Sequence, residues 1–95
     1  MNNYPTINMK ATGARITELR KSRGLKVKDI SDFMGFTEPQ AVYKWQRGES
    51  LPSLDNIFAL SILFHTTIED IIVSDFVADV VFSDRKTKYH FQQAA

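Results

Sequence analysis

One segment in the middle of the chain carries polar side chains at helical spacing. Gln40, Tyr43, Lys44 and Arg47 recur at i, i+3, i+4 and i+7, so a helix would present them on one face. They supply one amide, one phenol and two cations. An amide donates and accepts hydrogen bonds together, and the cations suit an anionic group such as phosphate. This combination predicts a surface that binds an anionic, hydrogen-bonding partner.

The chain offers little for catalysis or for metal binding. It has no cysteine and two histidines, His65 and His90, which excludes a zinc finger, an iron–sulfur site and a cysteine nucleophile. No Ser–His–Asp arrangement stands out. Asp29 and Asp32 lie three residues apart among lysines and fit surface charge better than an acid–base pair. We therefore expect no enzyme activity, no catalytic residue, no metal and no cofactor.

Charge is distributed unevenly along the 95 residues. The chain has 12 Lys and Arg against 11 Asp and Glu, which hides a separation by position. Nine cations and five acids lie between Lys10 and Ser50, whereas residues 51–84 contain six acids and no Lys or Arg. The cationic part favours a polyanion, and the acidic part favours solvent or a protein partner. Chance segregation of charge in a small domain is the alternative explanation.

Five short helices are expected to position the polar face. Capping residues and glycines mark their ends. The predicted helices run from Thr12, as N-cap, to Gly24; from about Val27 to Met34, before Gly35; from Thr37 to Gly48; from Ser53, as N-cap, through Phe64; and from a cap at Thr66 or Thr67 through the stripe Ile68, Ile71 and Ile72. Because no alternating apolar pattern precedes Asp75, the predicted fold class is all-α.

The link between the second and third predicted helices is typical of a helix-turn-helix. Gly35 allows a sharp turn, Phe36 fills the space between the helices, and the small Ser31 lets their backbones approach. This pattern alone does not identify a helix-turn-helix, because many helical bundles also contain two helices joined by a glycine. The residues predicted to lie in the core include Phe33, Phe36, Ala41, Val42, Trp45 and Phe64.

Gln40 has two interpretations. Thr37 and Gln40 match a Thr-x-x-Gln capping box, with Pro39 tolerated in the first helical turn. A capping Gln40 would point back along the helix and be less free to bind a partner. Both roles stay open at this point.

The chain divides into residues 1–11 as an N-terminal arm, residues 12–73 as the helical domain, and residues 74–95 as a C-terminal extension. We expect the apolar Tyr4, Ile7 and Met9 of the arm to pack on the domain. The apolar stretch 76–82 suits a helix or a strand equally. We expect the fifth helix and residues 74–82 to form a two-fold dimer contact, and a mobile basic tail to follow from Arg85.

Several short motifs occur in a fixed order along the domain. They are Arg15-Ile16-Thr17-Glu18-Leu19-Arg20, Arg23-Gly24-Leu25, Asp29-Ile30-Ser31, Gly35-Phe36-Thr37, Tyr43-Lys44-Trp45-Gln46-Arg47-Gly48, Leu51-Pro52-Ser53-Leu54, Leu60-Ser61 and Ile68-Glu69-Asp70-Ile71-Ile72. In order, spacing and helix length, residues 13–73 resemble the lambda-repressor-like family of DNA-binding domains, the Cro/repressor or XRE type. Within it they are most similar to a small bacterial subset that reads Gly-Phe-x-x-Pro-Gln-Ala-x-Tyr-Lys-Trp.

The resemblance implies a five-helix domain whose third helix, about residues 37–47, enters the major groove of double-stranded DNA. It implies base contacts from Gln40, Tyr43 and Lys44: an amide can bond adenine, a lysine can reach guanine, and a phenol can touch a thymine methyl. The residues implied to contact phosphates are Lys26, Lys28, Arg47, Ser50 and Arg15, with Lys10 extending the set.

Three departures from the family pattern concern this surface. Val27 stands where the family often has a Gln that donates to phosphate. Arg20 faces Gln46 where the family often has a Glu, so we expect a neutral hydrogen bond in place of a salt bridge. An extra residue around Thr37-Glu38-Pro39 shifts the start of the third helix.

The sequence therefore predicts a sequence-specific DNA-binding transcriptional regulator, and we expect it to act as a repressor in the cytoplasm. The alternative is a protein-binding module with the same fold, such as a toxin-neutralising antitoxin, whose acidic residues 51–84 would meet a basic partner. The N-terminus has no signal-peptide pattern, and the longest uncharged stretch, residues 56–68, is too short to cross a membrane.

Overall fold

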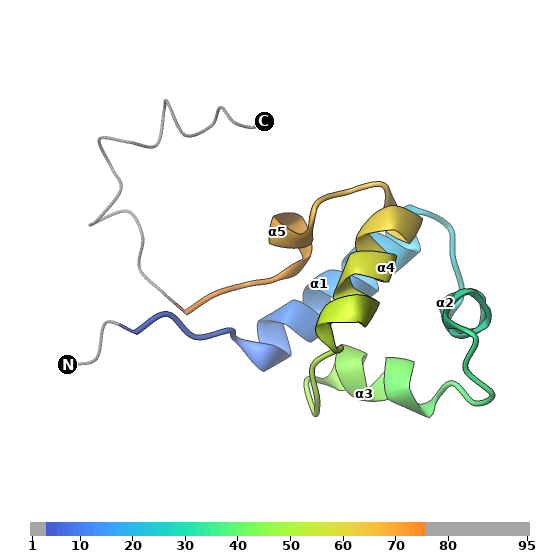
Figure 1. Ribbon diagram of the computed structural model, residues 1–95, viewed down its shortest axis with the longest axis horizontal. Helices are drawn as coiled ribbons and strands as arrows, with labels where there is room; N and C mark the ends of the chain where they lie inside the picture. The colour runs from blue at the N-terminus through green and yellow to red at the C-terminus, as the bar shows by residue number, and fades with distance from the viewer. Residues whose placement is uncertain (1–3, 76–95) are drawn as a thin grey trace.

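The computed structural model of the protein describes residues 4–75, and within them it contains five helices and no strand. The helices are α1 (Met9–Ser22), α2 (Val27–Met34), α3 (Gln40–Arg47), α4 (Leu54–Phe64) and α5 (Ile68–Ile71) (Figure 1). The prediction of an all-α, five-helix fold is confirmed. The predictions for residues 76–95, which include the apolar stretch 76–82 and the basic tail, lie outside the described residues.

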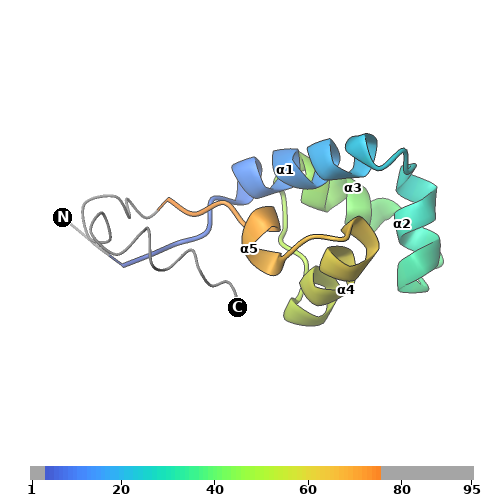
Figure 2. The ribbon, with the colours of Figure 1, turned by 90° about the horizontal axis from the view of Figure 1, so that it is seen from above.

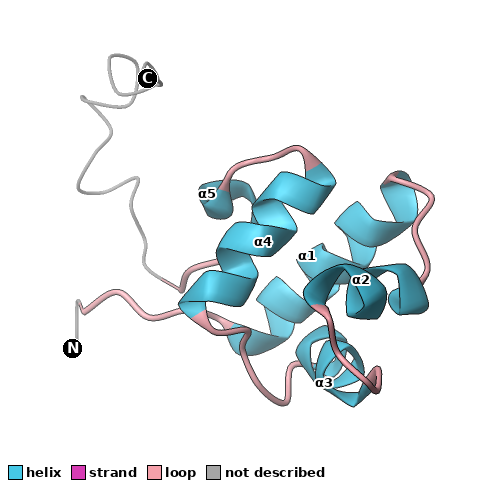
Figure 3. Ribbon diagram, turned by 45° about the vertical axis from the view of Figure 1, so that its right-hand side comes forward, coloured by secondary structure: helices cyan, strands magenta, loops and turns pink. Residues whose placement is uncertain are grey.

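α1 is the element around which the others are arranged. It runs along the body, with α5 beside its first half and α2 beyond its C-terminal end (Figure 2). α3 packs along α1, α2 lies against both α3 and α4, and α5 lies against α1 and α4 (Figure 3). α1 and α3 approach so closely that a Cβ added at Gly13 would lie 2.8 Å from the carbonyl oxygen of Gln46. This close approach fixes the position of α3.

Most predicted helix ends are confirmed. Gly35 and Gly48 follow α2 and α3 with φ of 76°, a conformation that costs glycine little because it has no Cβ. Ser53 caps α4 by accepting a hydrogen bond from the backbone N–H of Asn56 at 3.2 Å. Of the two candidate caps for α5, Thr67 is the one used.

Two predicted helix starts are wrong. α1 begins at Met9 and is capped by Asn8, whose side-chain oxygen accepts from the backbone N–H of Ala11 at 2.8 Å. Thr12 is fully buried inside this helix. α3 begins at Gln40 rather than at Thr37, and no side chain caps it, so the predicted capping box does not form. Asn8 precedes Thr12 and offers the same kind of capping oxygen, so the helix extends to the earlier residue.

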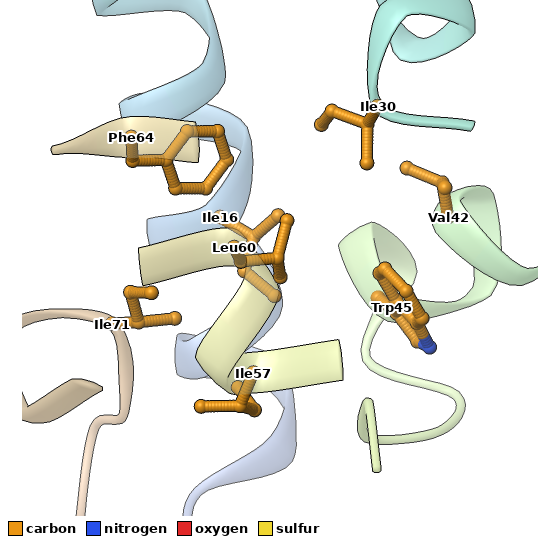
Figure 4. Packing of buried hydrophobic residues seen from close by; sticks show 8 residues of the cluster. All are labelled: Ile16, Ile30, Val42, Trp45, Ile57, Leu60, Phe64 and Ile71. Carbon is orange, nitrogen blue, oxygen red and sulfur yellow. The ribbon is translucent and has the colours of Figure 1, made fainter. Parts of the chain in front are cut away.

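Eight buried apolar side chains, contributed by all five helices, form the core. They are Ile16, Ile30, Val42, Trp45, Ile57, Leu60, Phe64 and Ile71 (Figure 4). Trp45 and Phe64 are core residues as predicted, and Phe36 packs its ring edge against Trp45 with ring centroids 5.9 Å apart. The prediction for Phe33 is wrong, because 50% of this residue is exposed. Ile30, Phe33 and Met34 lie at i, i+3 and i+4, which predicts one buried face, but only Ile30 of the three is fully buried.

The N-terminal arm is joined to the segment after α5. The backbone N–H of Asn8 donates to the carbonyl of Val73, and that of Asp75 donates to the carbonyl of Thr6, both at 2.8 Å. Ile7 and Ser74 form an antiparallel bridge between these bonds. Tyr4, Ile7 and Met9 are 74%, 44% and 39% exposed. Hydrogen bonds of the backbone and of Asn8 therefore hold the arm, more than burial of its apolar side chains does.

Candidate nucleic-acid interface

The turn between α2 and α3 places the second helix of the motif against the first. Behind Gly35, the N–H of Phe36 donates to the carbonyl of Ser31 at 2.9 Å and closes α2. The buried Ser31 hydroxyl donates to the carbonyl of Glu38 at 3.3 Å, which ties the turn to α2. Phe36 fills the angle between the helices by packing on Trp45. Gly35 and Phe36 have the roles that the sequence predicted, whereas the hydrogen bond from Ser31 was not predicted.

α3 is buried on one side and open on the other. Val42 is fully buried and Trp45 is 4% exposed, which holds the helix firmly to the core. On the opposite side, Gln40, Tyr43 and Lys44 are exposed. Because no side-chain cap forms at the start of α3, the amide of Gln40 is not engaged in the competing capping role. The structure thus brings all three predicted base-contacting residues together on one accessible face.

A surface hollow of about 300 Å³ lies beside this face, between α2 and α3. Its lining residues are Val27, Lys28, Ser31, Asp32, Thr37, Pro39 and Tyr43. Thr37 and Pro39, from the turn before α3, form part of its wall.

The start of α2 carries two of the predicted phosphate contacts. Lys26 and Lys28 are exposed there. The carboxylate of Asp29 already accepts a hydrogen bond from the backbone N–H of Lys26 at 2.8 Å, and Lys28 pairs with Asp32 at 3.0 Å. Both acids are exposed surface charges, as the sequence indicated. They also reduce the positive charge that this helix end presents to an anion.

The loop after α3 carries the next predicted contacts. Arg47 is exposed and bonded to Glu49, and Ser50 is half-buried. The backbone of this loop packs against α1, since a Cβ added at Gly48 would lie 2.7 Å from the Cα of Lys10. The exposed Lys10 therefore stands beside the loop and joins this group of residues.

Arg15 is not brought to the same place. Its Nε donates to the carbonyl of Asp70 in α5 at 2.7 Å. At about 100° per residue, Arg15 lies roughly 200° around α1 from Gly13, which faces α3. Spacing along the sequence could not reveal this, because the direction of Arg15 depends on where α5 packs.

Arg20 links α1, α3 and the turn before α2. Its Nε donates to the side-chain oxygen of Gln46, and a terminal nitrogen donates to the carbonyl of Leu25, both at 2.8 Å. The predicted neutral hydrogen bond between Arg20 and Gln46 is confirmed. It holds the C-terminal half of α3 to α1.

Comparison with known proteins agrees with this geometry. The sequence model of the helix-turn-helix family matches residues 16–71, more than half of the chain. The chain belongs to the helix-turn-helix family. The predicted resemblance to its lambda-repressor-like, XRE type is thereby confirmed.

One similar solved structure is the high-resolution crystal structure of the restriction-modification controller protein C.AhdI from Aeromonas hydrophila. The two sequences are 25% identical, and the structures superpose with a TM-score of 0.60. The match covers 66% of this chain and 94% of the C.AhdI chain. No curated protein matches the sequence. The protein is a DNA-binding transcriptional regulator, and the comparisons favour this function over the antitoxin alternative.

Residues 4–75 contain no candidate membrane-spanning helix and no candidate metal-binding cluster. No helix there has the length and apolar character needed to cross a membrane. No group of three or more His, Asp or Glu side chains in that part is placed to hold a metal ion.

Proposed function

We propose that the helix-turn-helix protein is a sequence-specific repressor that inserts α3 into the major groove of double-stranded DNA. The observation that carries this proposal is the two-sided character of α3. Its inner side is locked by Val42 and Trp45, and its outer side presents an amide, a phenol and a cation from Gln40, Tyr43 and Lys44. Rigid placement of such groups supports recognition of base edges.

The proposed phosphate contacts surround this face. They are Lys10, Lys26, Lys28, Arg47 and Ser50. Arg15 is left out of the set, because its guanidinium is bonded to a carbonyl of α5. The protein acts in this proposal by binding alone, without a catalytic step, and in the cytoplasm, where a bacterial chromosome or phage DNA is accessible.

Selection of bound duplexes from a random pool tests the proposal. We expect a defined sequence to emerge, and Gln40→Ala and Lys44→Ala each to reduce discrimination between selected and random DNA by about 1–3 kcal/mol. Lys21→Ala is the matched control, since Lys21 is an exposed lysine on α1 rather than on α3. Discrimination that survives both α3 changes would show that these residues do not read the bases.

Salt dependence tests the phosphate contacts separately. Lys10, Lys26, Lys28 and Arg47 would neutralise about four phosphates per protomer and give a slope of log K against log salt of about −4. Binding to random duplex DNA should therefore weaken steeply between low and physiological salt. A flat dependence would exclude this set of contacts.

We further propose that two copies pair through α4 when they bind a two-fold DNA site. Leu54, Phe58 and Ile62 follow each other at four-residue spacing and are 78%, 58% and 55% exposed. The expected contact through the fifth helix and residues 74–82 extends into residues 76–82, outside the described part of the chain, and Ile71 of the fifth helix is fully buried. An exposed apolar stripe on α4 supports an association surface.

Sedimentation equilibrium tests the pairing. Phe58→Glu would place like charges across a two-fold contact and should shift the protein toward monomer. Phe33→Glu is the control, because Phe33 is similarly exposed but lies on α2. A wild-type protein that stays monomeric at concentrations where it saturates DNA would contradict the pairing.

A further inference from the structure

An ion pair lies in the loop after α3, among the residues proposed to contact DNA phosphates. Arg47, the last residue of α3, donates from its Nε to one carboxylate oxygen of Glu49 at 2.6 Å. A terminal nitrogen of the same guanidinium reaches the other oxygen at 3.2 Å. The pairing is therefore bidentate, which is the geometry that an arginine also uses for phosphate.

The loop backbone sets this geometry. The N–H of Gly48 donates to the carbonyl of Trp45 at 3.1 Å, and the N–H of Glu49 donates to the carbonyl of Lys44 at 2.9 Å. Gly48 turns the chain with φ of 76° between the two paired side chains. Because its backbone is held in this way, Glu49 stays within reach of Arg47.

The charges around Glu49 act together. The hydrogen bond from Arg47 lowers the pKa of Glu49, and the charge of Lys44 acts in the same direction. The same contact raises the pKa of Arg47. Both side chains stay about half exposed, so a phosphate oxygen can approach the guanidinium from solvent.

We propose that Glu49 is an internal competitor of the DNA backbone for Arg47 and so sets the strength of DNA binding. This inference rests on the proposed function and names a residue that limits it. A phosphate must displace the carboxylate before it can take the bidentate site on Arg47. An exposed ion pair is weak enough for such an exchange, but its loss opposes binding. Because a phosphate contact carries no direct sequence information, the effect falls on all duplexes alike.

Binding to a random duplex measures this competition and needs no knowledge of the operator. Glu49→Gln keeps the size of the side chain and removes its charge. We expect its affinity to rise by about twofold to fivefold at low salt. The slope of log K against log salt should steepen by less than about 0.9, the value for one full phosphate contact, because Arg47 already belongs to the proposed wild-type contacts.

Two comparisons separate competition from general charge. Glu69→Gln removes the same charge from the exposed first turn of α5 and should change affinity and slope much less. In an Arg47→Gln background, Glu49→Gln should gain less than about half of its wild-type factor, because no guanidinium remains to be released.

The outcomes distinguish a failure of DNA binding from a failure of the competition by Glu49. Wild-type protein that binds no duplex would overturn the proposed function itself. Wild-type protein that binds, with Glu49→Gln unchanged, would overturn the competition alone. An equal gain with and without Arg47 would also overturn it, since Glu49 would then act by repelling the phosphates directly.

Discussion

Gly13 is the residue at which a single methyl group decides whether α3 fits against α1. A Cβ there would meet the backbone carbonyls of Trp45 and Gln46, the second at 2.8 Å. Backbone atoms cannot rotate away as the end of a side chain can. The packing of α3, and with it the position of the exposed Gln40, Tyr43 and Lys44, depends on the absence of that Cβ.

We predict that Gly13→Ala destabilises the protein by about 1–3 kcal/mol, the usual cost of forcing atoms into a packed interior. In an unpacked helix the same change would stabilise by up to about 1 kcal/mol, because alanine favours helix more than glycine does. Urea unfolding followed by circular dichroism measures the sign. Ala14→Gly, at an exposed neighbour in α1, is the control and should cost about 1 kcal/mol. A stabilised Gly13→Ala variant would contradict the close approach.

Single residues also show where sequence reasoning stops. The amide, phenol and cation of α3 were found from their types and spacing, and the structure places all three on one face. The family resemblance implies a phosphate contact for Arg15, but its guanidinium is bonded to the carbonyl of Asp70 in α5. Phe33 was assigned to the core although half of it is exposed. The surroundings of a side chain on a short helix can be predicted only when the elements packed against that helix are known.

At the scale of elements, α1 and α3 are joined through a polar contact that can be strengthened. Arg20 donates to the neutral oxygen of Gln46 at 2.8 Å. We predict that Gln46→Glu raises the free energy of unfolding by up to about 1 kcal/mol at pH 7, because a carboxylate accepts more strongly from a guanidinium. The gain should vanish below about pH 4, where the new carboxyl group is protonated.

Urea unfolding at pH 7 and at pH 3 checks this prediction. Gln46→Met, which removes the acceptor, should instead lower stability at both values of pH. A gain for Gln46→Glu that persists at pH 3 would mean that something other than charge is responsible.

The start of α5 supplies a second prediction that depends on pH. The Thr66 hydroxyl donates to the Asp70 carboxylate at 2.7 Å and, with help from Thr67 and the charge of Arg15, lowers the pKa of Asp70. A carboxyl group whose pKa is lower in the folded state stabilises the protein above its unfolded pKa of about 3.9. That contribution is lost as the pH falls through the lower, folded value.

Thr66→Val should therefore raise the pKa of Asp70 and destabilise the protein at neutral pH. The difference from wild type should shrink once the pH falls below about 4. Thr66→Ser keeps the hydroxyl and serves as the control. Titration of Asp70 by NMR gives the pKa directly, and an unchanged value in Thr66→Val would show that the hydroxyl is not its cause.

The order and type of the elements follow from the sequence, but two of their starts do not. Glycines end α2 and α3 as predicted, because left-handed backbone strongly favours glycine. The starts of helices are harder to predict, because several types of polar residue can act as the N-cap. Asn8 caps α1 although Thr12 also fits the pattern, and residues 37–39 form a turn although Thr37 and Gln40 fit a capping box.

For the whole molecule, the uneven charge along the chain becomes an uneven charge in space. The cations between Lys10 and Ser50 belong to α1, α2, α3 and the loops that join them. Among the described residues after Ser50, every charged side chain is an acid: Asp55, Glu69, Asp70 and Asp75. α4 and α5 carry three of these acids and no Lys or Arg. Such a distribution orients the protein with α3 toward a polyanion.

Thr12 connects the two ends of the described chain. Its buried hydroxyl accepts from the backbone N–H of Val73 at 2.9 Å, 61 residues away. The neighbouring carbonyl of Val73 accepts from the N–H of Asn8. The hydroxyl thus ties the start of α1 to the segment after α5 at a place that water does not reach.

We predict that Thr12→Val lowers the free energy of unfolding by about 1–3 kcal/mol, because it keeps the shape but leaves the part-buried Val73 N–H without this acceptor. Thr17→Val is the matched control. The Thr17 hydroxyl donates only to the carbonyl of Gly13, four residues earlier in the same helix, so its loss should cost much less. Hydrogen exchange locates the effect: the amides of Asn8 and Asp75 should lose protection in Thr12→Val and keep it in Thr17→Val. Equal costs for the two variants would mean that the link between the ends adds nothing to the stability of the molecule.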